Sequence, residues 1–193
     1  MLSNQNAHYD ILEALVVRYP ELACVEEDIL SAFELLCDCF RGGNKVLICG
    51  NGGSAADAGH IVGELMKSFT LGRKMDPAIY RKLEAMVPET AEGFCRFIEG
   101  TLPAIDLTGS NAFSTAFQND VSGVYVFAQQ VYGLAKEHDA LWCLSTSGNS
   151  ANVVLAAQMA KAKDVTVIGM TGSGGGKLLR WCDACIRVPA QET

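Results

Sequence analysis

The sequence lacks long hydrophobic runs, and it lacks an excess of positive charge. No apolar stretch approaches the roughly 20 residues that a membrane-spanning helix needs, so we expect no membrane segment. Residues 1–10 are polar, without the basic start and apolar middle of a secretory signal. The 22 acidic residues outnumber the 15 basic ones and give a net charge of −7. This balance argues against non-specific binding to nucleic acid or to an anionic membrane, but it permits a local phosphate site.

The eight cysteines do not have the distribution of a disulfide framework. Cys49 and Cys143 lie within apolar, strand-like runs, where a free thiol behaves as a small hydrophobic group. Cys182 and Cys185 have the spacing of a thioredoxin-type redox motif, but Cys185 enters a predicted strand and does not begin a helix. A zinc interpretation lacks a second Cys/His pair at ligand spacing. We therefore favour structural thiols and a reducing, cytoplasmic compartment.

Hydrophobic patterning predicts a single α/β domain over residues 1–193. Apolar residues recur at three- and four-residue spacing through residues 1–41, which predicts an N-terminal helical arm broken at Pro20. Five short apolar runs with helices between them predict a doubly wound five-stranded parallel sheet. Residues 73–100 mix both charges and contain two prolines, so we expect one or two solvated helices in an insertion. The predicted strands are residues 45–49, 103–107, 141–144, 164–170 and 185–188.

A serine-rich loop, residues 145–150, lies between a predicted strand and a helix predicted to begin near Asn152. A helix N-terminus has unpaired N–H groups and a partial positive charge, so hydroxyls added there would complete a site for a phosphate monoester. The alternative is an ordinary turn in which Ser150 caps the helix. We favour the anion site, because a cap needs only one hydroxyl. The hydroxyl-bearing residues are Ser145, Thr146, Ser147 and Ser150.

A glycine-rich turn follows the first predicted strand and precedes a helix expected at about residues 55–69. Read loosely, Gly50, Gly52 and Ala55 fit the dinucleotide fingerprint, but the next strand comes too late to supply the acidic residue that holds the ribose. Residues 171–177 superficially look like a Walker A loop, but they are one residue too short and lack the following Ser or Thr. We expect no nucleotide cofactor, and we expect the glycines to let the backbone approach a ligand.

Two pairs of polar residues are further candidates for chemistry. His60 and Glu64 are four residues apart and share one helical face, where they could transfer protons or bind a metal. The alternative is a surface pair of small energetic value, which the spacing alone favours. Asn119 and Asp120 interrupt a helical stretch and could bind sugar hydroxyls, although Asp120 could equally be a helix cap.

Taken together, the segments 49–54, 119–120 and 145–153 resemble the sugar isomerase (SIS) superfamily and, within it, the phosphoheptose isomerase family. Met170-Thr171-Gly172 and the ending Arg187-Val188-Pro189 fit the same pattern. The resemblance covers nearly the whole chain, and the insertion at residues 73–100 is longer than in the classical enzymes. It implies a flavodoxin-like fold and interconversion of sedoheptulose 7-phosphate and glycero-manno-heptose 7-phosphate through an enediol.

The resemblance also implies roles for individual residues. Glu64 would be the catalytic base, and His60 and Glu64 look like two ligands of a zinc ion. The phosphate would be held by the four hydroxyl-bearing residues of the serine-rich loop. The implied assembly is a homotetramer, with a sugar phosphate as the ligand and no nucleic acid or membrane as a direct partner. The sugar would be lined by Asn51, Gly52, Gly53 and Ser54, with Asn119 and Asp120 nearby.

The family pattern also predicts a second proton-transfer group, a histidine on a final long helix, and this sequence ends before that segment. Two expectations follow. The chain is either an isomerase in shortened form, or a non-catalytic SIS module that binds a sugar phosphate or a protein partner, as replication-initiation regulators of this superfamily do. Retention of Glu64 favours the isomerase, because a binding module has no need of that carboxylate.

Overall fold

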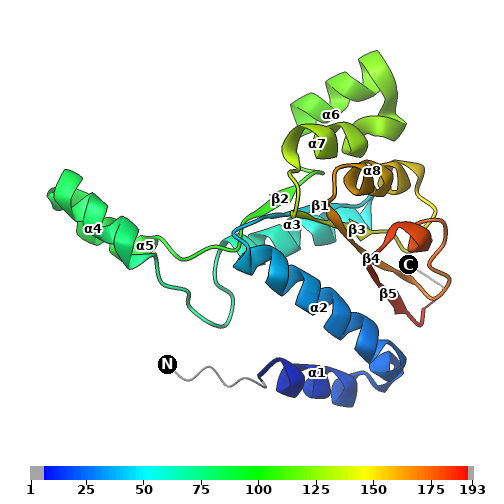
Figure 1. Cartoon of the computed structure of the whole chain (residues 1–193), viewed down its shortest axis with the longest axis horizontal. Helices are drawn as coiled ribbons and strands as arrows, with labels where there is room; N and C mark the ends of the chain where they lie inside the picture. The colour runs from blue at the N-terminus through cyan, green and yellow to red at the C-terminus, as the bar shows by residue number, and fades with distance from the viewer. Residues whose placement is uncertain (1–6, 191–193) are drawn as a thin grey trace.

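The computed structural model describes residues 7–190, and it contains a five-stranded, fully parallel sheet (Figure 1). The strand order β2-β1-β3-β4-β5 confirms the predicted doubly wound α/β fold. Each predicted apolar run supplies one strand, although β4 includes Thr171 and Gly172, which the sequence assigned to a loop. The strands are β1 Val46–Cys49, β2 Ala104–Asp106, β3 Ala140–Leu144, β4 Thr166–Gly172 and β5 Ala184–Val188.

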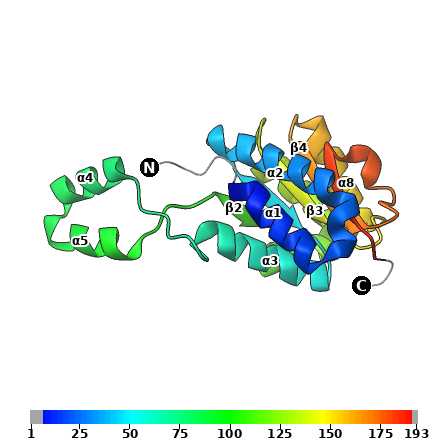
Figure 2. The same ribbon diagram turned by 90° about the horizontal axis from the view of Figure 1, so that it is seen from below.

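Helices cover both faces of the sheet, which explains why its central strands are apolar on both sides. Alternate residues of β1 point to opposite faces, so Leu47 packs under α7 and α8 while Ile48 packs under α2 and α3. Figure 2 shows α1, α2 and α3 together on one side of the sheet. The helices of these two layers are α1 Ala7–Arg18, α2 Glu26–Arg41, α3 Gly53–Met66, α7 Val126–Leu134 and α8 Ala151–Ala162.

The described part of the N-terminal arm, from Ala7 to Arg41, is helical as the periodicity predicts, and residues 1–6 of the predicted arm lie outside the described residues. Pro20 separates α1 from α2, and it begins a short 3-10 turn, Pro20–Val25. The break predicted near Asn119 is a π turn, Gln118–Ser122, which follows α6 Asn111–Phe117. Helix α3 begins at Gly53 and ends at Met66, so it starts two residues earlier and ends three residues earlier than the sequence suggested.

The segment between α3 and β2 forms a helical hairpin that projects away from the sheet (Figures 1 and 2). Its helices are α4 Pro77–Met86 and α5 Pro88–Phe97, and they pack mainly on each other. A bridge between Lys74 and Glu99 closes the neck of the hairpin. The guanidinium of Arg73 fastens this neck to the domain by donating to the carbonyl oxygens of Leu65 and Gly100, each at 2.7 Å.

A buried carboxylate ties together the amino ends of β1 and β3. Asp139 is only 2% exposed, and its side chain accepts hydrogen bonds from the backbone N–H of Lys45 at 3.0 Å and of Lys136 at 2.7 Å. The ammonium group of Lys45 forms an ion pair with the same carboxylate. Both carboxylate oxygens are thus paired with donors, as a buried charge requires.

In the part of the chain that the structure describes, no helix has both the length and the apolar character to span a bilayer.

Candidate active site

The candidate site lies at the point where the chain stops adding strands on one side of β1 and continues on the other side. The chain runs from β1 outward to β2 on one side, and β3, β4 and β5 follow on the other side of β1. The connections that leave the carboxyl ends of β1 and β3 therefore separate there, and ligands of doubly wound sheets bind at such a point. The glycine-rich turn after Cys49 and the serine-rich loop after Leu144 both leave from this edge.

The serine-rich loop presents hydroxyls to the N-terminus of α8 without using them as caps. Ser150 occupies the N-cap position, but its side chain makes no capping hydrogen bond. It pairs instead with the hydroxyl of Ser145 at 3.1 Å. Ser147 accepts from the backbone N–H of Asn149 at 3.1 Å, which shapes the turn. An ordinary capped turn does not describe this loop, whereas an anion site uses such hydroxyls.

The glycine-rich segment of residues 171–177 supports the serine-rich loop from behind. Gly148 has a φ of +62°, and a Cβ there would lie 2.0 Å from the carbonyl oxygen of Gly175. A Cβ on Gly176 would lie 2.4 Å from the carbonyl oxygen of Ser147. The two loops are further joined by the backbone N–H of Leu178, which donates to Gly148 at 2.9 Å. The glycines are therefore needed for close packing, which accounts for the superficial likeness to a Walker A loop.

The turn after β1 is held against α8 by a reciprocal pair of amides. The side chains of Asn51 and Asn152 each donate to the other at 2.9 Å. Gly52 is the N-cap of α3 and has a φ of +55°, a conformation that glycine adopts at low cost. Gly50 approaches Ser54 so closely that a Cβ would lie 2.6 Å from its carbonyl oxygen. These contacts place the N-termini of α3 and α8 beside each other.

Two adjoining hollows open between these loops. The smaller is polar, and its volume is about 270 Å³. The larger, of about 450 Å³, shares Ser54, Ser145 and Thr146 with it and extends along α3 to Asp57 and His60. The smaller hollow thus gathers most of the predicted ligand-binding residues: Asn51, Gly53, Ser54, Ser145, Thr146, Ser147 and Ser150.

The predicted proton-transfer pair lies on the α3 face that borders the larger hollow. His60 Nε2 is 4.0 Å from Glu64 Oε1, and the ammonium of Lys67 is 3.6 Å from the same oxygen. The other carboxylate oxygen, Oε2, is buried and has no hydrogen-bond partner in the described structure. His60 lines the hollow, whereas Glu64 lies one turn beyond it. The Glu64 carboxylate thus keeps one oxygen that could accept a proton, as the predicted role requires.

Comparisons with known proteins show the family of this chain. The model of the SIS domain matches residues 21–100 and 83–172. The phosphoheptose isomerase of Aneurinibacillus thermoaerophilus is 34% identical over 191 residues, which cover 99% of this chain and 81% of that protein. The enzyme of the same name from Rhodospirillum rubrum is 40% identical over 165 residues, covering 86% and 74% of the two chains. This chain belongs to the phosphoheptose isomerase family.

The solved structures support the same family. A phosphoheptose isomerase from Neisseria gonorrhoeae has a TM-score of 0.71 and 31% identity, over 98% of this chain and 87% of that one. A phosphoheptose isomerase from Francisella tularensis has a TM-score of 0.70 and 29% identity, over 99% and 88% of the two chains. These values show that the chain shares its fold with both structures over nearly its whole length.

The zinc site that the family resemblance implies is incomplete in a single chain. His60 and Glu64 provide an imidazole and a carboxylate on one helical face, both suitable donors for zinc. A structural site normally has four ligands and a catalytic site three, and within residues 7–190 no third His, Cys, Asp or Glu completes such a group. The described residues therefore do not fit zinc by themselves, and we derive no step through a metal.

Asn119 and Asp120 lie apart from both hollows. They are exposed on the π turn after α6, where the Asn119 amide donates to the Asp120 carboxylate at 2.7 Å. A third hollow, of about 290 Å³, separates this region from the Asn51–Asn152 pair, and Gln118 is the residue of the turn that lines it. Contact between a sugar and Asn119 or Asp120 thus stays a prediction, because neither residue lines the two hollows of the described chain.

Sequence reasoning did not single out two residues that the structure brings to the site. Asp57 lines the larger hollow, and its position three residues before His60 on one helical face could have identified it. Asn152 forms the amide pair with Asn51 across 101 positions of sequence. No local pattern could have revealed that contact, because it depends on how two loops meet.

Proposed function

We propose that this chain is an aldose–ketose isomerase that interconverts sedoheptulose 7-phosphate and glycero-manno-heptose 7-phosphate. The observation that carries the proposal is the placement of an uncapped, hydroxyl-rich N-terminus of α8 beside the α3 face that bears His60 and Glu64. One end can hold a phosphate, and the other can move a proton. The names of the family relatives support the same substrate class.

The phosphate would bind in the smaller hollow. No Lys or Arg occurs within residues 145–150, so attraction would come from the partial positive charge of the helix end, backbone N–H groups and hydroxyls. Ser145, Thr146, Ser147 and Ser150 would donate to the phosphate, since their hydroxyls line this hollow and do not cap the helix. The Asn51–Asn152 pair would hold the glycine-rich turn and the N-terminus of α8 at a fixed separation around the phosphate.

Isomerisation needs one base for the carbon-bound proton and a route for the hydroxyl proton. In the ketose-to-aldose direction, Glu64 would remove a proton from C1 to give the enediol and return that proton to C2. The hydroxyl proton moves from O1 to O2 in the same cycle. Within the described residues, Asp57 and His60 are the titratable side chains that line the larger hollow, so they are the candidates for this second transfer.

A homotetramer is the assembly that the family resemblance implies, and we include it in the proposal. Apolar residues next to the Asn119–Asp120 pair support burial by another copy: Val121 is 68% exposed and Tyr125 is 53% exposed. Such packing would also carry Asn119 and Asp120 toward a neighbouring site. Zinc enters the proposal only as an ion that would need ligands in addition to His60 and Glu64.

The second candidate is a SIS module that binds a sugar phosphate without turning it over. It is favoured by two observations: Glu64 does not line the hollow, and Lys67 contacts its carboxylate at 3.6 Å. The two functions differ in whether proton exchange and turnover occur and depend on Glu64. Binding of phosphate is common to both.

The test is proton exchange at C1 and formation of the aldose, followed by NMR after sedoheptulose 7-phosphate is added in deuterated water. Glu64→Gln should abolish both signals while it leaves sugar-phosphate affinity within about twofold of wild type. Glu84→Gln, a carboxylate on the hairpin, is the matched control and should behave as wild type. Turnover by Glu64→Gln at the wild-type rate would refute the assigned base. Binding without turnover in the unmodified protein would establish the second candidate.

A further inference from the structure

Four thiols form a row across the face of the sheet that α7 and α8 cover. Cys49 and Cys143 are register partners on β1 and β3, and their sulfurs are 3.9 Å apart. The next position in the row is Gly169 on β4, and the one after it is Cys185 on β5. The row thus has a gap at β4, because glycine has no side chain.

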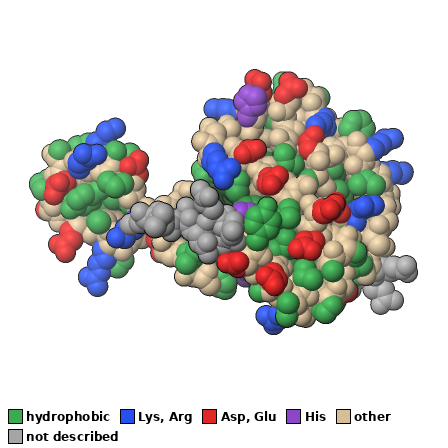
Figure 3. All heavy atoms as spheres, turned by 60° about the horizontal axis from the view of Figure 1, so that its bottom comes forward, with side chains coloured by type: hydrophobic (Ala, Val, Ile, Leu, Met, Phe, Trp, Pro, Cys, Tyr) green, Lys and Arg blue, Asp and Glu red, His purple; other side chains and the backbone are tan. Residues whose placement is uncertain are grey.

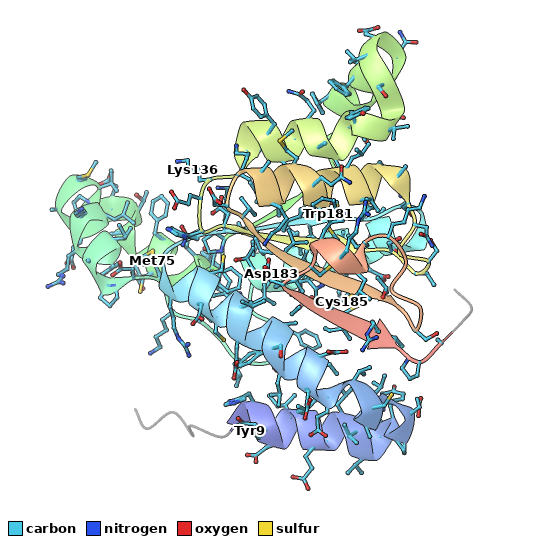
Figure 4. All side chains as sticks on the ribbon, turned by 45° about the vertical axis from the view of Figure 1, so that its right-hand side comes forward. Tyr9, Met75, Lys136, Trp181, Asp183 and Cys185 are labelled. Atoms are coloured by element: carbon cyan, nitrogen blue, oxygen red, sulfur yellow. The ribbon has the colours of Figure 1, made fainter. Side chains whose placement is uncertain are left out.

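Cys182 and Cys185 both turn their sulfurs into this gap. A Cβ on Gly169 would lie 2.6 Å from the sulfur of Cys182 and 2.9 Å from that of Cys185. The two thiols are near enough to shift each other's pKa, and the Cys182 thiol itself donates to the carbonyl oxygen of Leu178 at 3.4 Å. Figure 4 labels Cys185 on β5, and it labels Asp183 and Trp181 in the segment just before that strand. Convergence of two thiols at a glycine is more than hydrophobic packing requires.

The surroundings make the two thiols unequal. Hydrogen bonding from Cys182, aided by the Thr171 hydroxyl 3.8 Å away, lowers the pKa of Cys185 to about 7, although burial opposes this. The same hydrogen bond to Cys185, together with burial, raises the pKa of Cys182. The charged groups nearby are the Lys161–Asp183 ion pair on the side of Cys182, and Arg187 with Asp28 on the side of Cys185. Of the two thiols, Cys185 is therefore the one that loses its proton more readily.

We propose that Cys182 and Cys185 form a modification site, in which hydroperoxides oxidise the two thiols reversibly to a disulfide. Cys182 is partly exposed and Cys185 is buried, so the oxidant must be small. The Cys185 thiolate attacks one oxygen of hydrogen peroxide, the O–O bond breaks, and a sulfenic acid and water form once the leaving hydroxide takes up a proton. The Cys182 sulfur then displaces the hydroxyl of the sulfenic acid, and its proton leaves with that oxygen as a second water. Two thiols are oxidised and one peroxide is reduced.

The pair is connected to the larger hollow of the candidate site. Thr171 touches Cys185 and also lines that hollow, and β5 continues from Cys185 to Val188, another lining residue. Closing the disulfide removes the Cys185 thiol proton from the contact with Thr171, whose hydroxyl still donates to the Gly172 carbonyl, and it fixes the start of β5 to the preceding turn. We expect oxidation to alter ligand affinity by this route; this consequence rests on the proposed function, whereas formation of the disulfide does not.

The experiment uses the unmodified protein, treated with hydrogen peroxide and then alkylated under denaturing, non-reducing conditions. Trypsin releases residues 181–187 as one peptide that contains both cysteines and no others. This peptide should lose about 2 Da, resist alkylation, and recover both thiols with dithiothreitol. Cys182→Ala should prevent the 2 Da loss and leave Cys185 in a sulfenic form that a dimedone probe captures. Cys24→Ser combined with Cys95→Ser is the control, because those cysteines are exposed and separate from the pair.

Each outcome decides one part of the proposal. Two free thiols in the peptide after treatment, with Cys24 or Cys95 oxidised in the same sample, would overturn the dithiol pair. A disulfide with unchanged affinity for sedoheptulose 7-phosphate would retain the modification site and refute its connection to the hollow. If reduced protein fails to bind that sugar phosphate while the disulfide still forms, the proposed function fails and the modification site stands.

Discussion

Ser150 is in the N-cap position of α8, yet its hydroxyl pairs with Ser145 and leaves the helix end uncapped. Ser150→Ala should therefore spare the stability of the fold, in contrast with the loss of about 1 kcal/mol that follows removal of a true cap. It should weaken binding of inorganic phosphate by about 1–3 kcal/mol, since a charge-assisted hydrogen bond is lost. Urea unfolding and calorimetric titration measure the two quantities. A loss of stability with unchanged phosphate affinity would instead support the alternative, an ordinary turn in which Ser150 caps the helix.

Asp139 provides a second test at the scale of single residues. Asp139→Ala leaves Lys45 without its buried partner, and it leaves two backbone N–H groups without acceptors. Loss of one member of a buried pair typically destabilises by about 3–5 kcal/mol. Asp28→Ala is the control, because its pair with Arg187 is long, at 3.8 Å, and partly exposed, so we expect a change below about 1 kcal/mol. Equal effects of the two substitutions on urea unfolding would contradict this account.

At the scale of the elements, sequence patterns predict what depends on local periodicity. The apolar runs at β1 and β3 could be recognised because both faces of these strands are covered. The need for glycine at position 176 could not be recognised, since it arises from the backbone of Ser147 and Gly148, in a loop some 28 residues earlier. The same holds for the amide pair of Asn51 and Asn152. Contacts between loops are set by packing, and a single sequence does not encode them as a pattern.

The hairpin of α4 and α5 makes its principal contacts within itself, so it should be dispensable for folding. Figure 3 shows it standing apart from the rest of the surface, with apolar and charged side chains mixed over it. Replacing residues 75–98 by a short Gly/Ser linker keeps Lys74, Glu99 and the neck that Arg73 fastens. We expect a folded protein whose far-UV spectrum loses about two short helices and whose unfolding midpoint changes by only a few degrees. Loss of cooperative unfolding would show that the hairpin belongs to the core.

At the scale of the whole molecule, one chain brings together the phosphate end of the candidate site but leaves Asn119 and Asp120 outside it. If neighbouring copies complete the site, Val121→Asp should disrupt assembly, because Val121 is exposed beside this pair and a charge opposes its burial. We expect smaller particles in sedimentation velocity and a parallel loss of turnover, with phosphate affinity of the dissociated chain retained. Thr90→Asp adds the same charge on the hairpin and should leave the assembly intact. A dissociated Val121→Asp protein with full turnover would mean that each chain contains a complete site, and Asn119 and Asp120 would then have no part in it.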